Sequence, residues 1–345
     1  MEAWQKSLSE AITQPEELSA FLRVEGERLR PVVDRYPMRI TPYYLSLVKE
    51  ADDPIGRQCI PDSRELKEDR LSTDPFREKE LSPVPGIVHR YPDRVVLLAS
   101  TFCATLCRFC MRKHQVQQGG FISDSPLEPA IDYVRRNRVI RDIIISGGDP
   151  LVKPDEWIED LISRLRKISH VEIIRINTRI PVTLPERITT RLCQRLRLYH
   201  PLYINTHFNH PEEITEASSE ACRLLADAGI PLGNQTVLLR GVNDDPAVMK
   251  RLMQKLLMVR VRPYYIHQMD PVKGTSHFCT PIEKGLEIMA SLRGHTSGMA
   301  NPYYVIDLPG GKGKVPLLPD DVKRENRKYF LRNFQGETVE YVDEG

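Results

Sequence analysis

The sequence contains no long hydrophobic run, no excess of charge of one sign and no internal repeat. None of its 345 residues lies in a stretch approaching the ~18 consecutive apolar residues of a spanning helix, which excludes a membrane bundle. Lys and Arg number 49 and Asp and Glu number 47, so the net charge of +2 gives no whole-protein field that would attract nucleic acid. With 41% hydrophobic residues, the composition is that of a globular protein rather than a collagen-like or disordered chain.

The N-terminal segment and the cysteines predict a cytoplasmic protein. The first ten residues, MEAWQKSLSE, have no apolar core segment, so we expect no signal peptide. The seven cysteines are odd in number, which argues against a disulfide framework, and three of them lie close together. We therefore expect reduced thiols with metal or redox chemistry, and neither nucleic acid nor a membrane as a partner.

Short apolar runs alternate with helix-length segments from residue 94 onward. The runs are residues 95–98, 143–145, 173–176, 202–204, 236–239, 264–266 and 304–306. Continuous apolar runs of this length predict strands buried on both faces. Helices are predicted between them over residues 154–167, 211–228 and 245–258. This alternation predicts βαβ units and a parallel sheet.

The number of these units favours an α/β barrel that is closed or partly closed. A doubly wound sheet is the alternative, but the sequence has neither a Rossmann nor a P-loop glycine fingerprint. We expect a helical N-terminal wrap and connector over residues 1–85, the barrel over 86–318 and a C-terminal tail over 319–345. Because polar residues follow six of the predicted strands, one site is expected at the mouth formed by the carboxyl ends of the strands.

The strongest motif is Cys103, Cys107 and Cys110, spaced CxxxCxxC after the first predicted strand. Thiolates suit iron–sulfur clusters, and three on one loop leave one iron of a [4Fe–4S] cluster open to a ligand. A structural zinc site with His114 as the fourth ligand is one alternative, and unpaired buried cysteines are another. Phe109 before the last cysteine and the βα context favour the cluster.

Two glycine-containing segments follow other predicted strands. Gly147 and Gly148 follow the second strand, where a glycine pair indicates only that something approaches the backbone closely. Residues 307–314, DLPGGKGK, follow the last strand. A lysine in such a loop suits a phosphate group or a Schiff base with pyridoxal phosphate, although a solvated basic turn is the commoner outcome.

The cysteine spacing resembles the signature of the radical S-adenosylmethionine (radical SAM) superfamily. With the glycine–lysine loop, the chain resembles lysine 2,3-aminomutase along nearly its whole length. The similar segments include residues 40–45, 82–86, 89–94, 206–210, 233–235, 238–244, 262–265 and 292–298. This resemblance implies a partial (β/α)6-type radical SAM barrel with a helical N-terminal extension.

The resemblance also implies three cofactors. The three cysteines would hold the [4Fe–4S] cluster, and Lys314 would form the aldimine with pyridoxal 5′-phosphate; Lys312, where the family has glycine, is the competing lysine. Arg94 and Tyr91 would be further pyridoxal phosphate contacts. The residues implied to contact S-adenosylmethionine are Ser146, Gly147, Gly148, Asp149, His207 and Gln235.

The implied substrate is L-lysine, whose amino group would move from Cα to Cβ after hydrogen abstraction by a 5′-deoxyadenosyl radical. Arg112 would bind the α-carboxylate, while Asp270 and Asp307 would clamp the ε-ammonium, because a buried cation requires paired negative charge. An external donor of the flavodoxin or ferredoxin type would supply the electron. The alternatives are a lysine aminomutase serving elongation factor P and a 2,3-aminomutase for another amino acid.

One family feature is missing from this sequence. Characterised relatives carry a zinc-binding cysteine cluster in a C-terminal extension, and a remote zinc cysteine where Asp245 stands here. We therefore expect no structural zinc, with a homodimer as one possible assembly in place of the usual oligomer.

Overall fold

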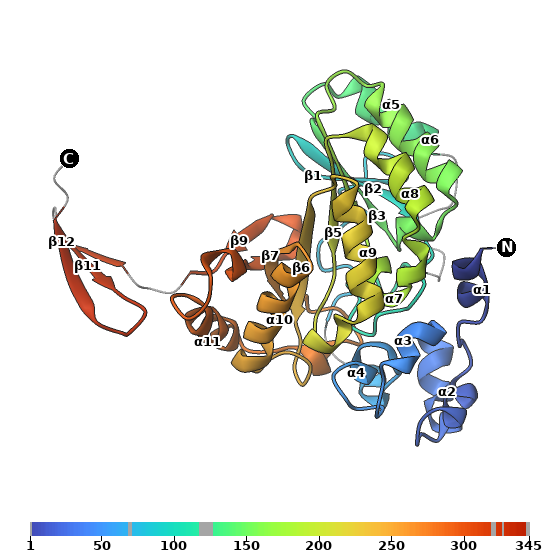
Figure 1. Cartoon of the computed structure of the whole chain (residues 1–345), viewed down its shortest axis with the longest axis horizontal. Coiled ribbons are helices and arrows are strands. Elements are labelled where there is room, and N and C mark those ends of the chain that lie inside the picture. The colour runs from blue at the N-terminus through green and yellow to red at the C-terminus, as the bar shows by residue number, and fades with distance from the viewer. Residues whose placement is uncertain (1, 68–70, 117–126, 319–321, 326–327, 343–345) are drawn as a thin grey trace.

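The computed structural model, which describes residues 2–67, 71–116, 127–318, 322–325 and 328–342, contains a nine-stranded sheet with helices on its outer face (Figure 1). Sequence order and spatial order are the same in this sheet. The strands are β1 (Ile87–Tyr91), β2 (Arg94–Ser100), β3 (Asp142–Gly147), β4 (Ile173–Asn177), β5 (Leu202–Thr206), β6 (Leu232–Leu238), β7 (Val261–Gln268), β8 (Tyr303–Asp307) and β9 (Lys314–Pro316).

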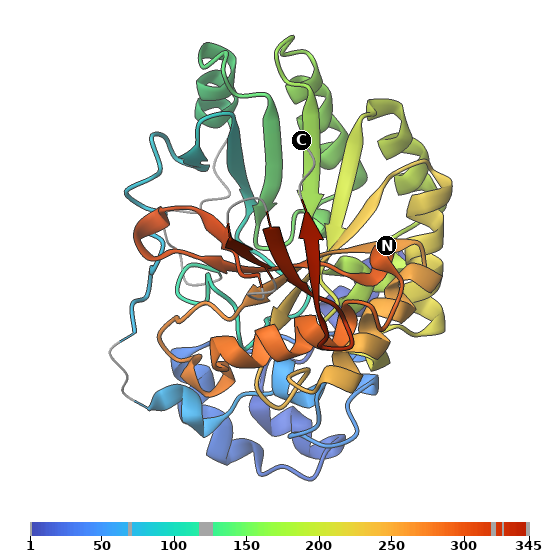
Figure 2. The same cartoon turned by 90° about the vertical axis from the view of Figure 1, so that its left-hand side faces the viewer.

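Strands β2 to β8 are parallel, and β1 and β9 pair antiparallel at the two edges. Six crossovers connect the parallel strands and place their helices around the outside of the curled sheet (Figure 2). The crossover helices are α5 (Glu128–Arg136), α6 (Asp155–Arg166), α7 (Ile180–Thr183), α8 (Thr190–Leu196), α9 (Glu216–Asp227), α10 (Pro246–Met258) and α11 (Ile282–Leu292). The predicted partial (β/α)6 barrel is confirmed.

The helix boundaries follow from capping side chains. Helix α10 begins after Asp245, whose Oδ1 accepts hydrogen bonds from the backbone N–H groups of Ala247 and Val248. The helix predicted over residues 211–228 is instead a short 3₁₀ turn at Pro211–Glu213 followed by α9. Thr215 separates the two because its hydroxyl caps α9, and Gly229, with φ of +79°, follows the helix end.

The prediction that the strands are buried on both faces holds for the end of β2, where residues 97–100 are all buried, but is wrong for β3 and β4. In β3, Ile143 and Ile145 belong to the hydrophobic core, whereas Ile144 and Ser146 line a central cavity. Arg175 of β4 also faces the cavity. β3 and β4 therefore alternate between a core face and a cavity face, because the inner side of the curled sheet holds a site and not a second layer of helices.

The N-terminal segment contributes α1 (Ala3–Ser9), α2 (Gly26–Arg35), α3 (Pro42–Ser46) and α4 (Gly56–Cys59), which gather at one end of the sheet (Figure 1). Tyr44 connects α3 to the barrel by donating to Glu213 Oε1 at 2.7 Å.

At the other end of the chain, β10 (Val322–Glu325), β11 (Lys328–Arg332) and β12 (Thr338–Val342) form a separate antiparallel sheet (Figure 1). The turn between β11 and β12 contacts the segment after α11, where the ring of Phe334 packs edge-on against His295. The predicted division at residues 85 and 318 stays a prediction. In the described part of the chain, no helix has both the length and the apolar character needed to cross a membrane.

Candidate active site

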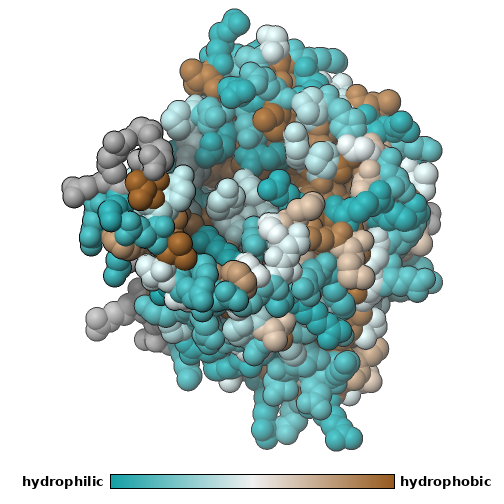
Figure 3. Space-filling view, turned by 60° about the vertical axis from the view of Figure 1, so that its left-hand side comes forward, coloured by the Kyte–Doolittle hydropathy of each residue, from teal (hydrophilic) through white to brown (hydrophobic). Residues whose placement is uncertain are grey.

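A cavity of about 790 Å³ extends along the inner face of the curled sheet to the carboxyl ends of the parallel strands, and the face shown in Figure 3 is hollowed. Every residue that the sequence assigned to a metal, cofactor or substrate lines it. These residues are Tyr91, Arg94, Cys103, Cys107, Cys110, Arg112, Ser146, Gly147, Gly148, Asp149, His207, Gln235, Asp270, Asp307 and Lys314. The fold thus brings the predicted residues into one site, while the role of each stays a prediction.

The cysteine loop is attached to the end of β3 through two backbone hydrogen bonds. Gly148 N donates to Ser100 O at 2.6 Å, and Asp149 N donates to Phe102 O at 2.8 Å. A Cβ at Gly148 would lie 2.4 Å from Phe102 O, and one at Gly147, where φ is +114°, would lie 2.5 Å from Ser100 O. The glycine pair is therefore required by the close packing of β3 against the cysteine loop.

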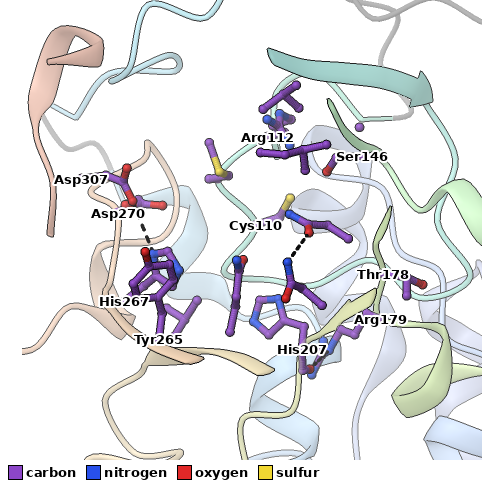
Figure 4. Close-up of a pocket in the computed structure, with 18 of the residues that line it drawn as sticks. Cys110, Arg112, Ser146, Thr178, Arg179, His207, Tyr265, His267, Asp270 and Asp307 are labelled. Carbon is purple, nitrogen blue, oxygen red and sulfur yellow. Dashed lines mark hydrogen bonds and ion pairs between the residues drawn. The ribbon is translucent and has the colours of Figure 1, made fainter. Parts of the chain in front are cut away.

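The three thiols face the cavity from this loop, with Cys110 near Arg112 (Figure 4). Burial raises the pKa of Cys110 to about 11 and also raises the pKa of Cys103 well above its usual value. The protein surroundings therefore do not by themselves keep the sulfurs of Cys103 and Cys110 ionised. Bound metal would supply the positive charge that deprotonates them, as expected for iron–sulfur ligands.

The residues fit a cluster better than the zinc alternative. His114 is engaged elsewhere, because its Nε2 lies 3.0 Å from Lys273 O and its ring packs edge-on against Tyr36. Among the described residues, no three Cys, His, Asp or Glu side chains converge as ligands of a single metal ion. A cluster needs no such convergence, since each cysteine binds a different iron.

Arg179, which the sequence analysis missed, contacts a cysteine sulfur directly. Its Nη1 donates to Cys107 Sγ at 2.8 Å, and its Nη2 donates to Tyr44, Gln58 and Glu213. Although burial opposes it, the neighbouring Cys107, Tyr44 and Glu213 raise the pKa of Arg179 well above its usual value. The positively charged Arg179 guanidinium is thus held beside Cys107 by hydrogen bonds to side chains of α3 and α4.

Asp149 and His207, both predicted to contact S-adenosylmethionine, differ in whether their side chains are free to hydrogen-bond to a ligand. The Asp149 carboxylate accepts from the Thr178 hydroxyl and from the backbone N–H groups of Leu151 and Arg179, so its side chain holds the surrounding loops. Burial, together with Arg179, lowers the pKa of His207 well below its usual value, so the ring is neutral. Within the described residues His207 Nε2 has no hydrogen-bond partner, which suits a polar ligand.

Lys314 projects into the cavity, whereas the competing Lys312 is exposed. The Nζ of Lys314 forms an ion pair with Asp307 Oδ2 and lies 3.2 Å from His267 Nδ1. Arg90 Nη1 donates to the other oxygen of Asp307 at 3.1 Å. Although burial opposes it, contacts with His267 and Lys314 hold the pKa of Asp307 well below its usual range, so this carboxylate is ionised.

Asp270 lies beside Asp307 at the same side of the cavity (Figure 4). Burial, and then repulsion by Asp307, raise the pKa of Asp270 to about 7. Its carboxylate forms no ion pair with any described residue, whereas Asp307 has Arg90 and Lys314. This side of the cavity therefore carries one carboxylate that lacks a cation.

Arg112 forms an ion pair with Glu78, which lies in the predicted N-terminal connector. Its Nε and Nη2 donate to the two carboxylate oxygens of Glu78 at 2.8 and 2.6 Å. This bidentate pair fixes the guanidinium plane and leaves Nη1 available for a ligand. At another wall of the cavity, Arg94 stacks over Tyr91 with its guanidinium carbon 3.9 Å from the ring centre.

Comparisons with known proteins identify what the chain is similar to. A family model described as "Radical SAM superfamily" matches residues 97–252, and one described as "Lysine-2,3-aminomutase" matches residues 289–344. The L-lysine 2,3-aminomutase of Clostridium subterminale is 49% identical over 99% of this chain and 84% of its own length. That of Acetoanaerobium sticklandii is 48% identical over 98% of this chain and 84% of its own length.

A relative with a different substrate is almost as similar. The glutamate 2,3-aminomutase of Clostridioides difficile is 45% identical over 99% of this chain and 82% of its own length. Overall sequence identity therefore does not show whether lysine or glutamate is the substrate. The charged side chains of the cavity are the better guide to this choice.

Proposed function

We propose that this chain, which belongs to the lysine 2,3-aminomutase family, moves the amino group of L-lysine from Cα to Cβ and so produces L-β-lysine. The chain is an isomerase of that family with a radical SAM fold, and its cofactors are a [4Fe–4S] cluster and S-adenosylmethionine. Members of the family also use pyridoxal phosphate. The proposal extends this to a specific substrate and to specific residues.

The observation that carries the proposal is the pair of carboxylates, Asp270 and Asp307, in the same cavity as the three cysteines and Lys314. Asp307 already binds an ammonium group, that of Lys314. Pyridoxal phosphate, when bound, would supply imine chemistry at the substrate nitrogen. A substrate ε-ammonium beside the two aspartates would give Asp270 the cation that it lacks among the described residues.

Arg112 supports recognition of the other end of the substrate. It lies across the cavity from the two aspartates in Figure 4, and its Nη1 is not engaged by Glu78. A guanidinium held flat by a bidentate partner is suited to an α-carboxylate. Lysine would thus be held by opposite charges at its two ends, which fixes the position of its β-carbon.

The remaining contribution of the chain is to protect a reactive site. The cluster and S-adenosylmethionine, when bound, supply a radical that abstracts hydrogen. Phe109, Val237 and Met269 line the cavity and belong to a local hydrophobic cluster, so they exclude water from its centre. The electron would come from an external flavodoxin- or ferredoxin-type donor.

Glutamate is the second candidate substrate, because a relative named for it is 45% identical to this chain. Its side-chain carboxylate would add negative charge beside Asp270 and Asp307, and like charges in a buried site are strongly unfavourable. The pair of carboxylates therefore favours lysine.

A product assay tests the proposal. The full chain, reconstituted anaerobically with iron, sulfide and pyridoxal phosphate, is given S-adenosylmethionine, a reductant and either lysine or glutamate, and the β-amino acid is quantified. We expect β-lysine, with kcat/KM for lysine at least ~100-fold above that for glutamate. Asp270→Asn should lower kcat/KM for lysine, whereas Asp132→Asn, at an exposed ion pair on α5, should not. Equal use of the two substrates, or no β-lysine, would contradict the proposal.

A further inference from the structure

We infer that His267 is the proton acceptor that converts Lys314 from an ammonium into the neutral amine needed to form its imine. This inference rests on the proposed role of Lys314 in binding pyridoxal phosphate, and it assigns the step that makes that binding chemically feasible. A protonated lysine has no lone pair with which to attack a carbonyl carbon.

The contact between the two side chains defines the state of the imidazole. His267 Nδ1 lies 3.2 Å from Lys314 Nζ and 3.4 Å from Asp307 Oδ2. Nδ1 is within reach of both groups, so it accepts from the Lys314 ammonium when it carries the lone pair and donates to Asp307 when it carries a proton. In the neutral tautomer that accepts from Lys314, the ring proton is on Nε2, which has no hydrogen-bond partner among the described residues.

Asp307 touches the same ammonium but is unsuited to accept its proton. The contacts of Asp307 with His267 and Lys314 outweigh its burial and keep its pKa well below the usual range. Such a carboxylate stabilises a neighbouring cation without taking its proton. His267 differs, because its uncharged ring gains the attraction of the ionised Asp307 when it takes the proton, although burial and the charge on Lys314 lower its pKa.

The transfer leaves the net charge of the three groups unchanged. The Nζ–H bond of Lys314 breaks and an Nδ1–H bond forms on His267, so the positive charge moves 3.2 Å and stays beside Asp307. The neutral Nζ then bonds to the aldehyde carbon of pyridoxal phosphate, and water leaves. The charge on Lys314 that opposed protonation of His267 is lost in the same step.

The other groups around His267 do not compete for this role. Arg90 on β1 binds the far oxygen of Asp307, and Tyr265 on β7 packs its ring edge-on against the imidazole at 5.4 Å. His207, from the loop after β5, is a further ring held neutral by burial, and Asp270 follows β7. Of the described side chains, those hydrogen-bonded to Lys314 Nζ are His267 and Asp307.

The test measures imine formation and not turnover. Full-length protein carrying its cluster but freed of pyridoxal phosphate is mixed with that compound, without reductant, and the absorbance of the imine is followed by stopped flow from pH 6 to pH 9. Borohydride reduction and peptide mapping then identify the modified lysine. The variants are His267→Gln and His267→Ala, and His170→Gln, whose ring bonds Val134 O outside the cavity, is the matched control.

We expect His267→Gln to form the imine roughly 100-fold more slowly than wild type at pH 7, the usual size of an acid–base contribution. Its rate should rise more steeply with pH than that of wild type, because hydroxide from the solvent must then take the proton in place of His267. Imidazole added to His267→Ala should restore the rate, and this rescue separates proton transfer from a structural role.

Wild-type rates and an unchanged pH profile in both His267 variants would overturn the inference. So would a slow His267→Ala that imidazole fails to rescue. If wild-type protein itself forms no imine at Lys314, the proposed function fails, which is a distinct result.

Discussion

The pKa of Asp270 leads to a prediction about how lysine binding depends on pH. In the proposed function lysine binds to the ionised form of Asp270, because only the carboxylate attracts the ε-ammonium. Burial and the neighbouring Asp307 raise the pKa of Asp270 to about 7 in the substrate-free protein. At that value the side chain is about nine-tenths ionised at pH 8 and about one-tenth ionised at pH 6.

The affinity for lysine should therefore fall about tenfold between pH 8 and pH 6 through Asp270 alone, or ~1.4 kcal/mol. Asp270→Asn carries no charge in this range and should bind lysine more weakly at pH 8. The affinity ratio of wild type to Asp270→Asn isolates Asp270, since titration of the substrate amino group affects both proteins equally. That ratio should fall about tenfold from pH 8 to pH 6.

Equilibrium dialysis with labelled lysine, using protein that carries its cluster but no pyridoxal phosphate and no reductant, measures this ratio with Lys314 in the state that the structure shows. Glutamate provides a second comparison, since its side-chain carboxylate is accepted more readily when Asp270 is protonated, so its affinity should rise as the pH falls. A ratio that stays constant between pH 6 and pH 8 would refute the argument, as would glutamate affinity that falls in parallel with lysine affinity.

Three further predictions concern the cysteine loop and the aspartate pair. Gly148→Ala should lower the amount of iron and sulfide bound after reconstitution, because the added Cβ would lie 2.4 Å from Phe102 O. Gly298→Ala is the control and should bind the wild-type amount, because a Cβ added there would meet no other atom within 4 Å. Arg179→Gln should shift the reduction potential of the cluster to more negative values in an electron paramagnetic resonance titration, because a cation is lost from beside Cys107; Arg179→Lys should shift it less. Asp270→Asn should raise Tm of the ligand-free protein by at least ~2 °C at pH 8 and less at pH 5. The sign follows because the folded-state pKa of Asp270 lies above its unfolded value of ~3.9, so ionisation destabilises the folded state as pH rises through that interval.

The sequence predicted the strands well because each carries an apolar run, but it misjudged what the alternate residues do. Arg175 and Asn177 interrupt the run of β4 at alternate positions, and both line the cavity. The period of two in this strand was the available signal. Asn177, Thr178 and Arg179 also follow the third predicted strand in the way that polar residues follow the others, so the same rule would have found Arg179.

Glu78, Tyr44 and Gln58 belong to the site but lie in no local sequence pattern that would have predicted it. Glu78 lies in a polar connector whose composition resembles any surface loop, and its pairing with Arg112 depends on how that connector crosses the barrel mouth. Tyr44 and Gln58 reach Arg179 only through packing of α3 and α4 against the barrel. These contacts join residues that are 34 to 135 positions apart, and no periodicity or spacing encodes them.

The central claim is that lysine lies in this cavity with its β-carbon beside the radical generated at the cysteine cluster. Lysine carrying deuterium at Cβ tests this most directly, when it is incubated anaerobically with the reconstituted full chain, S-adenosylmethionine and reductant. We predict that deuterium appears in 5′-deoxyadenosine and is returned to β-lysine. Cleavage of S-adenosylmethionine that leaves 5′-deoxyadenosine free of deuterium would contradict the account.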